Sequence, residues 1–308
     1  MVTKTTNTSK TTTTKKAKSK KVEVEPTTGI IAVDNGGHYT KVFSESMEEP
    51  ISLSSRKAYG HDRLRTKSNY ESGTYRLVYK DEIYFMGTLM EEGEGEMTSF
   101  TTTKTTEYFI LSVLQACALY GYDVNKVVTC TPFSRFTDSE EDGIVKALLG
   151  EHEIEVNDVI YNFAIDDVVV TPEVTPAFFN EMPEGKVHWL DIGSRTIGYA
   201  TTMFDGENFR IIEKETGTLE RKGLDQYKPN NLKSYASMTA NELLRHWNPN
   251  EPVVIFGGGV DFYPEIATEM QAFFPELTVG ENPRFLQVKG MLEYGKLEYT
   301  PVDEEEEE

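Results

Sequence analysis

The sequence predicts an α/β protein with two related lobes, and three observations support this class. Strand-like apolar runs precede helix-like periodic segments in both halves of the 308-residue chain. Each half opens with an apolar run that ends in an Asp-x-Gly turn, at Asp34 and again at Asp191. The composition is 38% hydrophobic, so a chain of this length can bury a substantial core.

In the first half, the opening apolar run predicts a buried strand, and the turn after Asp34 joins it to a second strand as a hairpin. The clearest helix has apolar residues on one face from Phe109 to Tyr120, and Gly121 provides its C-terminal stop. Residues 46–70 are polar and irregular. The expected elements are strands at 30–33 and 39–43, a hairpin of 76–79 and 83–86, a helix at 105–120, a strand at 127–130, a helix at 139–149, strands within 151–171 and a short helix at 176–180.

The second half repeats this opening, with a strand that leads into the turn Asp191 to Ser194. A further hairpin is expected around Asp205 and Gly206. The expected elements are strands at 187–190, 199–204 and 209–214, a helix within 230–247, a strand at 253–256, and helices at 264–274 and 286–294.

Charge and composition exclude several classes of protein. The formal net charge is −20, and such an acidic chain does not form a broad DNA-binding face. Residues 1–28 are rich in Thr, Lys and Ser, and residues 303–308 are all acidic, so both tails are predicted to be disordered. The two cysteines, Cys117 and Cys130, fit a reduced, cytoplasmic protein, and the longest uncharged run, 108–122, is too short to span a membrane.

The two Asp-x-Gly turns carry the chemistry of a phosphate site. Glycine lets the backbone approach phosphate oxygens closely, and an Asp at the end of a strand can hold a hydrated Mg²⁺ ion. Lys41 follows the first turn and can reach a phosphate as a point charge. One such turn is common in ordinary hairpins, but two of them, each opening a hairpin, form a stronger signal.

A third glycine-rich turn strengthens the prediction. Gly257, Gly258 and Gly259 follow the apolar strand 253–256 and precede a helix. Consecutive glycines leave a flat backbone surface on which a base or ribose could rest near a helix N-terminus. The alternative is a flexible loop.

These turns together resemble the signatures of the actin, Hsp70 and sugar-kinase superfamily, in order from Gly29 to about Lys296. Within it, the sequence resembles bacterial actin-like plasmid-segregation proteins of the ParM type. The passage 191–196 is similar to their second phosphate loop, 169–177 to the first connecting segment and 288–295 to the second. The passage 128–132 is similar to the strand that ends in proline.

The resemblance implies an actin-like fold with two related lobes around a nucleotide cleft. The first lobe would be 29–185, with a small inserted subdomain at about 46–100. The second lobe would be a shortened one at 186–284, and residues 285–302 would return to the first lobe. The interval from Asp191 to Gly257 is too short for a full fourth subdomain, which would be reduced or absent, as in the short segregation protein AlfA.

The resemblance also implies the site. ATP, or alternatively GTP, would bind with Mg²⁺ between the lobes. Asp34 and Asp191 would serve as catalytic residues and metal ligands, and Glu173 would position the attacking water; the alternative for Glu173 is a helix cap. The other candidate nucleotide-binding residues are Asn35, Gly36, Gly37, Lys41, Gly193, Ser194, Arg195, Thr196, Gly257, Gly258, Gly259, Arg221 and Lys222.

Several positions depart from the family pattern or stay ambiguous. Gly198 stands where relatives often carry an Asp, and Cys130-Thr131 replaces a step that often contains glycine. Arg221 and Lys222 could contact an exposed base, or could be solvated loop charges. His38 could line the site, or could be an ordinary turn residue.

The function implied by the resemblance is an ATP-hydrolysing protein that forms homopolymeric filaments. Such filaments would segregate plasmid or phage DNA through a DNA-binding adaptor protein, with no membrane partner. Two alternatives stay open: a small-molecule kinase of the same superfamily, and an actin-like scaffold that holds nucleotide without hydrolysing it.

Overall fold

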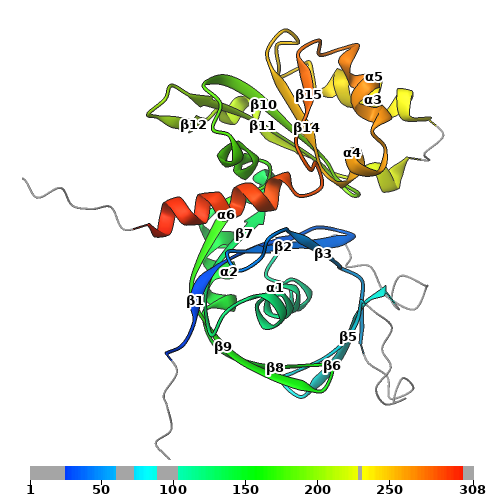
Figure 1. Cartoon of the computed structure of the whole chain (residues 1–308). Helices are drawn as coiled ribbons and strands as arrows, with labels where there is room; N and C mark the ends of the chain where they lie inside the picture. Colours follow the sequence, from blue (N-terminus) through cyan, green and yellow to red (C-terminus); the bar gives the residue numbers. More distant parts are fainter. Residues whose placement is uncertain (1–24, 60–72, 89–102, 228–230, 301–308) are drawn as a thin grey trace, which may run out of the picture.

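The structure is a computed structural model that describes residues 25–59, 73–88, 103–227 and 231–300. It confirms the α/β class, with two sheets that form two lobes (Figure 1). Most of both predicted tails lies outside the described residues. The described residues begin before the predicted Gly29, and Thr27 donates from its backbone N–H to Asp123 Oδ2 at 2.8 Å.

The first lobe contains a nine-stranded mixed sheet in the order β3-β2-β1-β7-β9-β8-β5-β6-β4. Strands β1, β7 and β9 are parallel neighbours, and the other pairs are antiparallel. The strands are β1 (Thr28–Asn35), β2 (Tyr39–Ser44), β3 (Ile51–Ser54), β4 (Lys57–Tyr59), β5 (Thr74–Tyr79), β6 (Glu82–Gly87), β7 (Val124–Thr131), β8 (Gly150–Val156) and β9 (Val159–Pro172).

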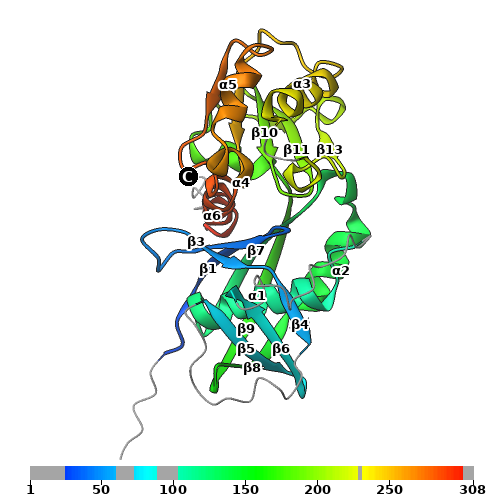
Figure 2. The ribbon, with the colours of Figure 1, turned by 90° about the vertical axis from the view of Figure 1, so that its right-hand side faces the viewer.

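The sheet curls around helix α1 (Glu107–Tyr120), as Figure 1 shows. Thr106 caps this helix by accepting a hydrogen bond from the Phe109 N–H. The helix is buried along most of its length, including Leu111 and Leu114 at 0% exposure, which explains its apolar composition. Helix α2 (Asp138–Leu148) lies on the outer flank of this lobe (Figure 2).

The described residues of the range 46–100 contribute β3 to β6 to the same sheet. The predicted hairpin of 76–79 and 83–86 is present as β5 and β6, whereas part of the stretch expected to be irregular forms the short strands β3 and β4. This range joins the sheet because β5 pairs with β8, and the edge strands of the sheet are β3 and β4.

A buried lysine ties the last strand of this sheet to the central helix. The Lys57 ammonium donates to Ser112 Oγ at 2.5 Å and to the carbonyl of Tyr108. Burial lowers the pKa of Lys57 to about 7. Because β4 is a short strand whose inward residue is a lysine, its sequence lacks the apolar alternation that predicts a strand.

The second lobe contains a six-stranded sheet in the order β12-β11-β10-β14-β15, with β13 paired to β11. Its strands are β10 (Gly185–Ile192), β11 (Ile197–Phe204), β12 (Phe209–Ile211), β13 (Gly217–Leu219), β14 (Val253–Phe256) and β15 (Leu277–Val279). Its helices are α3 (Leu232–Leu243), α4 (Gly258–Phe262) and α5 (Glu265–Gln271). The sequence predicted neither β13 nor β15, which have three residues each.

The last helix, α6 (Leu286–Tyr299), returns to the first lobe and lies between the two lobes in both ribbon views (Figures 1 and 2). It extends beyond the predicted end at residue 294. Val288, Met291 and Leu292 pack against Ile30 and Val128 in one buried cluster. Gly290 allows a close approach, because a Cβ there would lie 1.8 Å from the carbonyl oxygen of Pro176.

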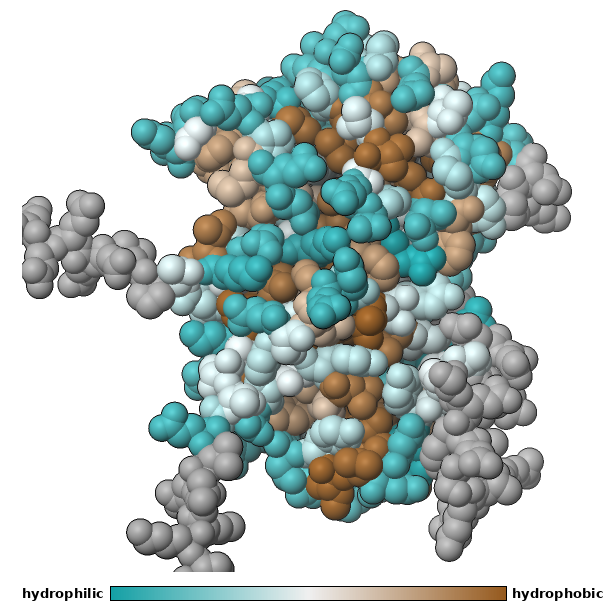
Figure 3. Space-filling model, viewed as in Figure 1, coloured by the Kyte–Doolittle hydropathy of each residue, from teal (hydrophilic) through white to brown (hydrophobic). Residues whose placement is uncertain are grey.

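The face of the molecule seen in Figure 3 is mostly hydrophilic, in line with the acidic composition. Figure 3 shows hydrophilic residues across the waist between the lobes, with apolar residues in separate patches on each lobe. Among the described residues, no helix has both the length and the apolar character needed to cross a membrane.

Candidate functional site

A cavity of about 580 Å³ lies between the two lobes, and both Asp-x-Gly turns face it. The structure therefore brings together residues that are far apart in the sequence. The predicted site residues that line this cavity are Asp34, Asn35, Gly36, Gly37, Lys41, Glu173, Asp191, Gly193, Ser194, Arg195, Thr196, Gly258 and Gly259.

The first loop is the tight turn between β1 and β2. Lys41 Nζ lies 2.8 Å from Asp34 Oδ2, and both side chains are largely buried. Burial disfavours the charged form of Asp34, but the Lys41 ammonium overcomes this and holds the pKa of Asp34 below its ordinary value. Asp34 is therefore a carboxylate at neutral pH.

The second loop joins β10 to β11 and touches the first. A Cβ on Gly37 would lie 2.8 Å from Arg195 Cδ and 3.0 Å from Ser194 Oγ, so the close approach of the loops requires glycine here. The Gly36 and Gly193 N–H groups are used within their own turns, on the carbonyls of Tyr39 and Thr196. Among the described residues, no acceptor is found for the backbone N–H groups of Gly37 and Ser194, which could serve a bound anion.

The pKa values of the two aspartates are shifted in opposite directions. Burial raises the pKa of Asp191 to about 7, and the charges of Asp34 and Glu173 contribute to this increase against the opposing effect of Lys41. Within the described part of the chain, no hydrogen bond or ion pair is found for the Asp191 carboxylate. A divalent cation would satisfy this carboxylate, because Mg²⁺ prefers carboxylate oxygens. The donor set therefore fits the predicted metal.

Glu173 lies at the end of β9, where the backbone is held by contacts from two elements. Its N–H donates to the Thr131 carbonyl at 2.7 Å, and the next N–H, of Val174, donates to Gln287 Oε1 at 2.8 Å. Val174 is buried with a φ of +79°, a conformation that a β-branched residue adopts only under constraint. The peptide after the proposed catalytic carboxylate is thus strained and fixed by α6.

The glycine triplet 257–259 opens a short helix. Gly257 precedes the five-residue helix α4, in which Gly258 and Gly259 take part. Gly257 itself does not line the cavity, but its φ of +101° and its proximity to Asp191 Oδ1, 2.0 Å from a Cβ placed on it, exclude a side chain. Gly258 and Gly259 line the cavity as predicted.

Arg221 and Lys222 are absent from the lining that the structure describes. Lys222 Nζ lies 3.9 Å from Met238 Sδ instead. The following residues reach the site, because the N–H groups of Gly223, Leu224 and Asp225 donate to carbonyls of the second loop. This segment carries Asp225, whose Oδ2 lies 3.0 Å from His38 Nε2 of the first loop. His38 thus lines the cavity and contacts the other lobe.

Three cations that were not predicted also line the cavity: Arg135, which pairs with Glu220, and the two described next, Lys104 and Arg284. Lys104 Nζ lies 3.0 Å from Glu173 Oε1. The Arg284 guanidinium lies over the Phe262 ring, 4.6 Å from its centroid, and forms a 2.6 Å ion pair with Asp261. Neither residue belongs to a glycine-rich turn, so no local signal in the sequence pointed to them.

Both departures from the family pattern have local explanations. Gly198 pairs with Asp191 across the β10–β11 hairpin, and a Cβ there would lie 2.4 Å from Val174 Cγ2. The strained Val174 therefore occupies the space that a larger residue would need. Cys130 is fully buried, with its Sγ 3.5 Å from Asp34 Oδ1 and 3.3 Å from Gln287 Nε2.

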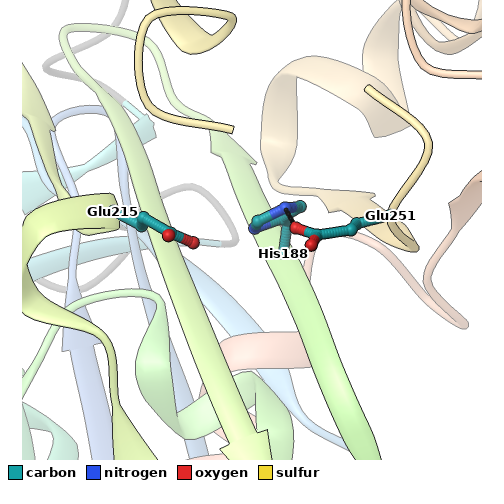
Figure 4. Close-up of side chains that lie close together, drawn as sticks. All are labelled: His188, Glu215 and Glu251. Carbon is teal, nitrogen blue, oxygen red and sulfur yellow. Dashed lines mark hydrogen bonds and ion pairs between the residues drawn. The ribbon is translucent and has the colours of Figure 1, made fainter. Parts of the chain in front are cut away.

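A second cluster of ionisable groups, beside the sheet of the second lobe, contains His188 of β10 with Glu215 and Glu251 (Figure 4). The side chain of His188 is fully buried, and its Nε2 lies 2.8 Å from Glu251 Oε2. The Lys186 ammonium lies 2.8 Å from Glu215 Oε2 and 2.9 Å from Glu251 Oε2. Lys186 is thus a cation shared by the two carboxylates, and we interpret the cluster as a structural ion-pair network.

We expect Lys186→Met to lower the thermal stability of the protein, because it leaves two neighbouring carboxylates without their shared cation. The loss should be about 1 kcal/mol, since the pair is partly exposed and solvent screens it. Lys186→Arg should retain most of the stability. Thermal unfolding monitored by circular dichroism would measure this, and equal melting temperatures for all three proteins would contradict the assignment.

Comparison with known proteins places the fold. Residues 32–174 match the family model described as the N-terminal domain of actin-like proteins. No curated protein sequence matches the chain. A ParM filament structure from Clostridium botulinum superposes with a TM-score of 0.72 at 16% identity, over 88% of this chain and 99% of the other.

Two AlfA structures give similar results. AlfA from the Bacillus subtilis plasmid pLS32, solved as a filament, has a TM-score of 0.70 at 17% identity, over 89% of this chain and 100% of that one. An AlfA filament bound to AMPPNP has a TM-score of 0.67 at 18% identity, over 88% and 97%.

The chain therefore has the actin-like fold, and its residues 32–174 match the model of the N-terminal domain of actin-like proteins. The predicted resemblance to ParM-type proteins and to AlfA is confirmed at the level of the fold.

Proposed function

We propose that the protein binds and hydrolyses ATP with Mg²⁺ and assembles into actin-like filaments. The observation that carries this proposal is the cavity between the lobes. There, two Asp-x-Gly loops from different sheets face each other, and Glu173 lines the same cavity. Phosphoryl transfer to water requires groups that position the phosphates, neutralise their charge and orient the water. The two glycine turns, the two aspartates with their metal ion, and Glu173 would supply these groups.

Each group has a role that its position supports. Asp34 and Asp191 would hold the Mg²⁺ ion, and Lys41 would offset phosphate charge. The second-loop residues Gly193 to Thr196 and the helix-opening Gly258 and Gly259 would contact the rest of the nucleotide. The bound metal would neutralise charge on the phosphates, while Glu173 would orient the attacking water.

Assembly and cellular role rest on the fold relatives. ParM and AlfA structures with the same fold were solved as filaments, and one AlfA filament contains AMPPNP. We infer that this chain polymerises with copies of itself and takes part in plasmid or phage DNA segregation. Because the chain carries a net charge of −20, we expect it to reach DNA through a separate DNA-binding adaptor.

Sedimentation and electron microscopy of the full-length protein would test the proposal. We expect filaments with ATP and Mg²⁺, with less assembly after chelation of the metal. Phosphate release should accompany assembly. Failure to form filaments with any nucleotide, salt concentration or crowding agent would contradict the polymer. Transfer of phosphate to a sugar in a coupled assay would instead favour a small-molecule kinase.

A further inference from the structure

A lysine outside the predicted motifs lies beside the carboxylate that we assign to water positioning. Lys104 Nζ is 3.0 Å from Glu173 Oε1 and 3.1 Å from the carbonyl oxygen of Asn35. The two side chains are 15% and 17% exposed, so solvent screens this pair only weakly. Lys104 therefore connects Glu173 directly to the first loop.

The backbone that carries Lys104 is fixed independently of Glu173. Glu140, in the first turn of α2, accepts hydrogen bonds from the Thr103 hydroxyl at 2.8 Å and from the Lys104 N–H. Two residues later, Thr106 caps α1. Since both flanks are anchored, little additional conformational freedom is lost when the Lys104 side chain is held in the site.

The carboxylates that line the cavity favour a cation beside Glu173. Asp34 is paired with Lys41, but Glu173 lies among the same carboxylates and has Lys104 as its ion-pair partner. Burial would lower the pKa of Lys104, but the charge of Glu173, with smaller contributions from Cys130 and Asp34, raises it above its ordinary value. Lys104 is therefore a permanent cation at neutral pH.

We propose that Lys104 is a positioning residue that holds the Glu173 carboxylate in the orientation needed to align the attacking water. This inference rests on the proposed ATP hydrolysis. Lys104 acts through Glu173, so its loss should reduce kcat and leave nucleotide affinity intact. A misplaced catalytic group costs about 10- to 100-fold in rate, which is the expected size of the effect.

The first experiment compares Lys104→Met, Lys104→Arg and Lys296→Met in the full-length protein. The control residue, Lys296, forms a lysine–glutamate pair with Glu293 on α6, outside the cavity. We expect Lys104→Met to lower kcat for phosphate release by about 10- to 100-fold, with KM for ATP and Kd for a fluorescent ADP within about twofold of wild type. Lys104→Arg should recover most of the rate, and Lys296→Met should match wild type.

The second experiment asks whether Lys104 acts through Glu173. In a Glu173→Gln background, Lys104→Met should cause no further loss of rate. An equal loss in both backgrounds, or weaker binding of ATP in Lys104→Met, would show that Lys104 contacts the phosphates directly and would overturn the inference.

A readout without nucleotide separates this inference from the proposed function. Thermal unfolding of the wild type, both single variants and the double variant gives the coupling between Lys104 and Glu173 in the ligand-free protein. If no protein hydrolyses ATP, the proposed function fails, whereas a measurable coupling would still support the ion pair. Additive effects of the two substitutions on stability would overturn the inference even if ATP is hydrolysed.

Discussion

Replacing Glu173 with glutamine is expected to slow ATP hydrolysis by about 100-fold or more and to leave nucleotide binding unchanged. Glutamine keeps the size of the side chain but cannot accept a proton from, or orient, the attacking water in the same way. Glu173 lines the cavity with both aspartates, and the strained Val174 that follows it fixes its backbone. Such strain near a reactive group is a common feature of catalytic sites.

Single-turnover phosphate release and binding of a fluorescent nucleotide would separate the two effects. Glu155→Gln is a matched control, because Glu155 is also partly buried in an ion pair, with Arg76, but lies outside the cavity. It should hydrolyse ATP at the wild-type rate. Equal rates near zero for wild type and Glu173→Gln would show that the protein is a non-hydrolysing scaffold.

The two phosphate loops could be predicted because each is a local feature. An apolar strand, an Asp and a glycine within a few residues determine a tight hairpin, and the structure contains both hairpins, with Asp34 paired to Lys41 and Asp191 to Gly198. Local sequence features also predicted α1, because its N-terminal cap, Thr106, and its C-terminal glycine, Gly121, directly flank the helix. The pattern of strand and turn was therefore sufficient for these parts.

Residues that enter the site through long-range contacts could not be predicted in this way. Lys104 reaches Glu173 across 69 positions of sequence, and Gln287 reaches Val174 across 113. Neither has a distinctive neighbourhood in the sequence. A base contact of Arg221 or Lys222 stays a prediction, since neither residue is among those that line the cavity, whereas Gly223 to Asp225 donate hydrogen bonds to the second phosphate loop.

The two edge strands of the first sheet could also not be predicted from the sequence patterns. Strands β3 and β4 are four and three residues long, and β4 turns a lysine rather than an apolar side chain toward the interior. Short strands without alternation give no periodic signal. What holds them is pairing with β2 and β6 and the contacts of Lys57 with α1, all of which exist only in the folded chain.

Asp191→Asn is expected to stabilise the ligand-free protein at pH 8 while it weakens binding of nucleotide with Mg²⁺. The pKa of Asp191 is raised from 3.8 to about 7, so in this interval the folded protein holds a proton that the unfolded chain has released. The contribution of Asp191 to stability therefore falls as the pH rises through 7, and above that the carboxylate is charged at a cost to the fold. Asparagine carries no charge and so removes this cost. The free energy of unfolding should rise by about 2 kcal/mol, less than the full pKa shift implies, because solvent in the cavity screens the charge.

The matched substitution Asp34→Asn should have the opposite sign. Lys41 holds the pKa of Asp34 below 3.8, so its carboxylate stabilises the fold at neutral pH, and this stability is lost only as the pH falls through that lowered value. Asparagine leaves Lys41 buried without its partner, which should cost about 3 kcal/mol. Urea unfolding of both variants at pH 6 and pH 8, without metal or nucleotide, would measure the two effects, and destabilisation by both at pH 8 would contradict the assignment. Because Mg²⁺ would displace the proton from Asp191, the wild type should release more protons than Asp191→Asn on binding Mg²⁺ and ATP near pH 7, as measured by calorimetry in buffers of different ionisation enthalpy.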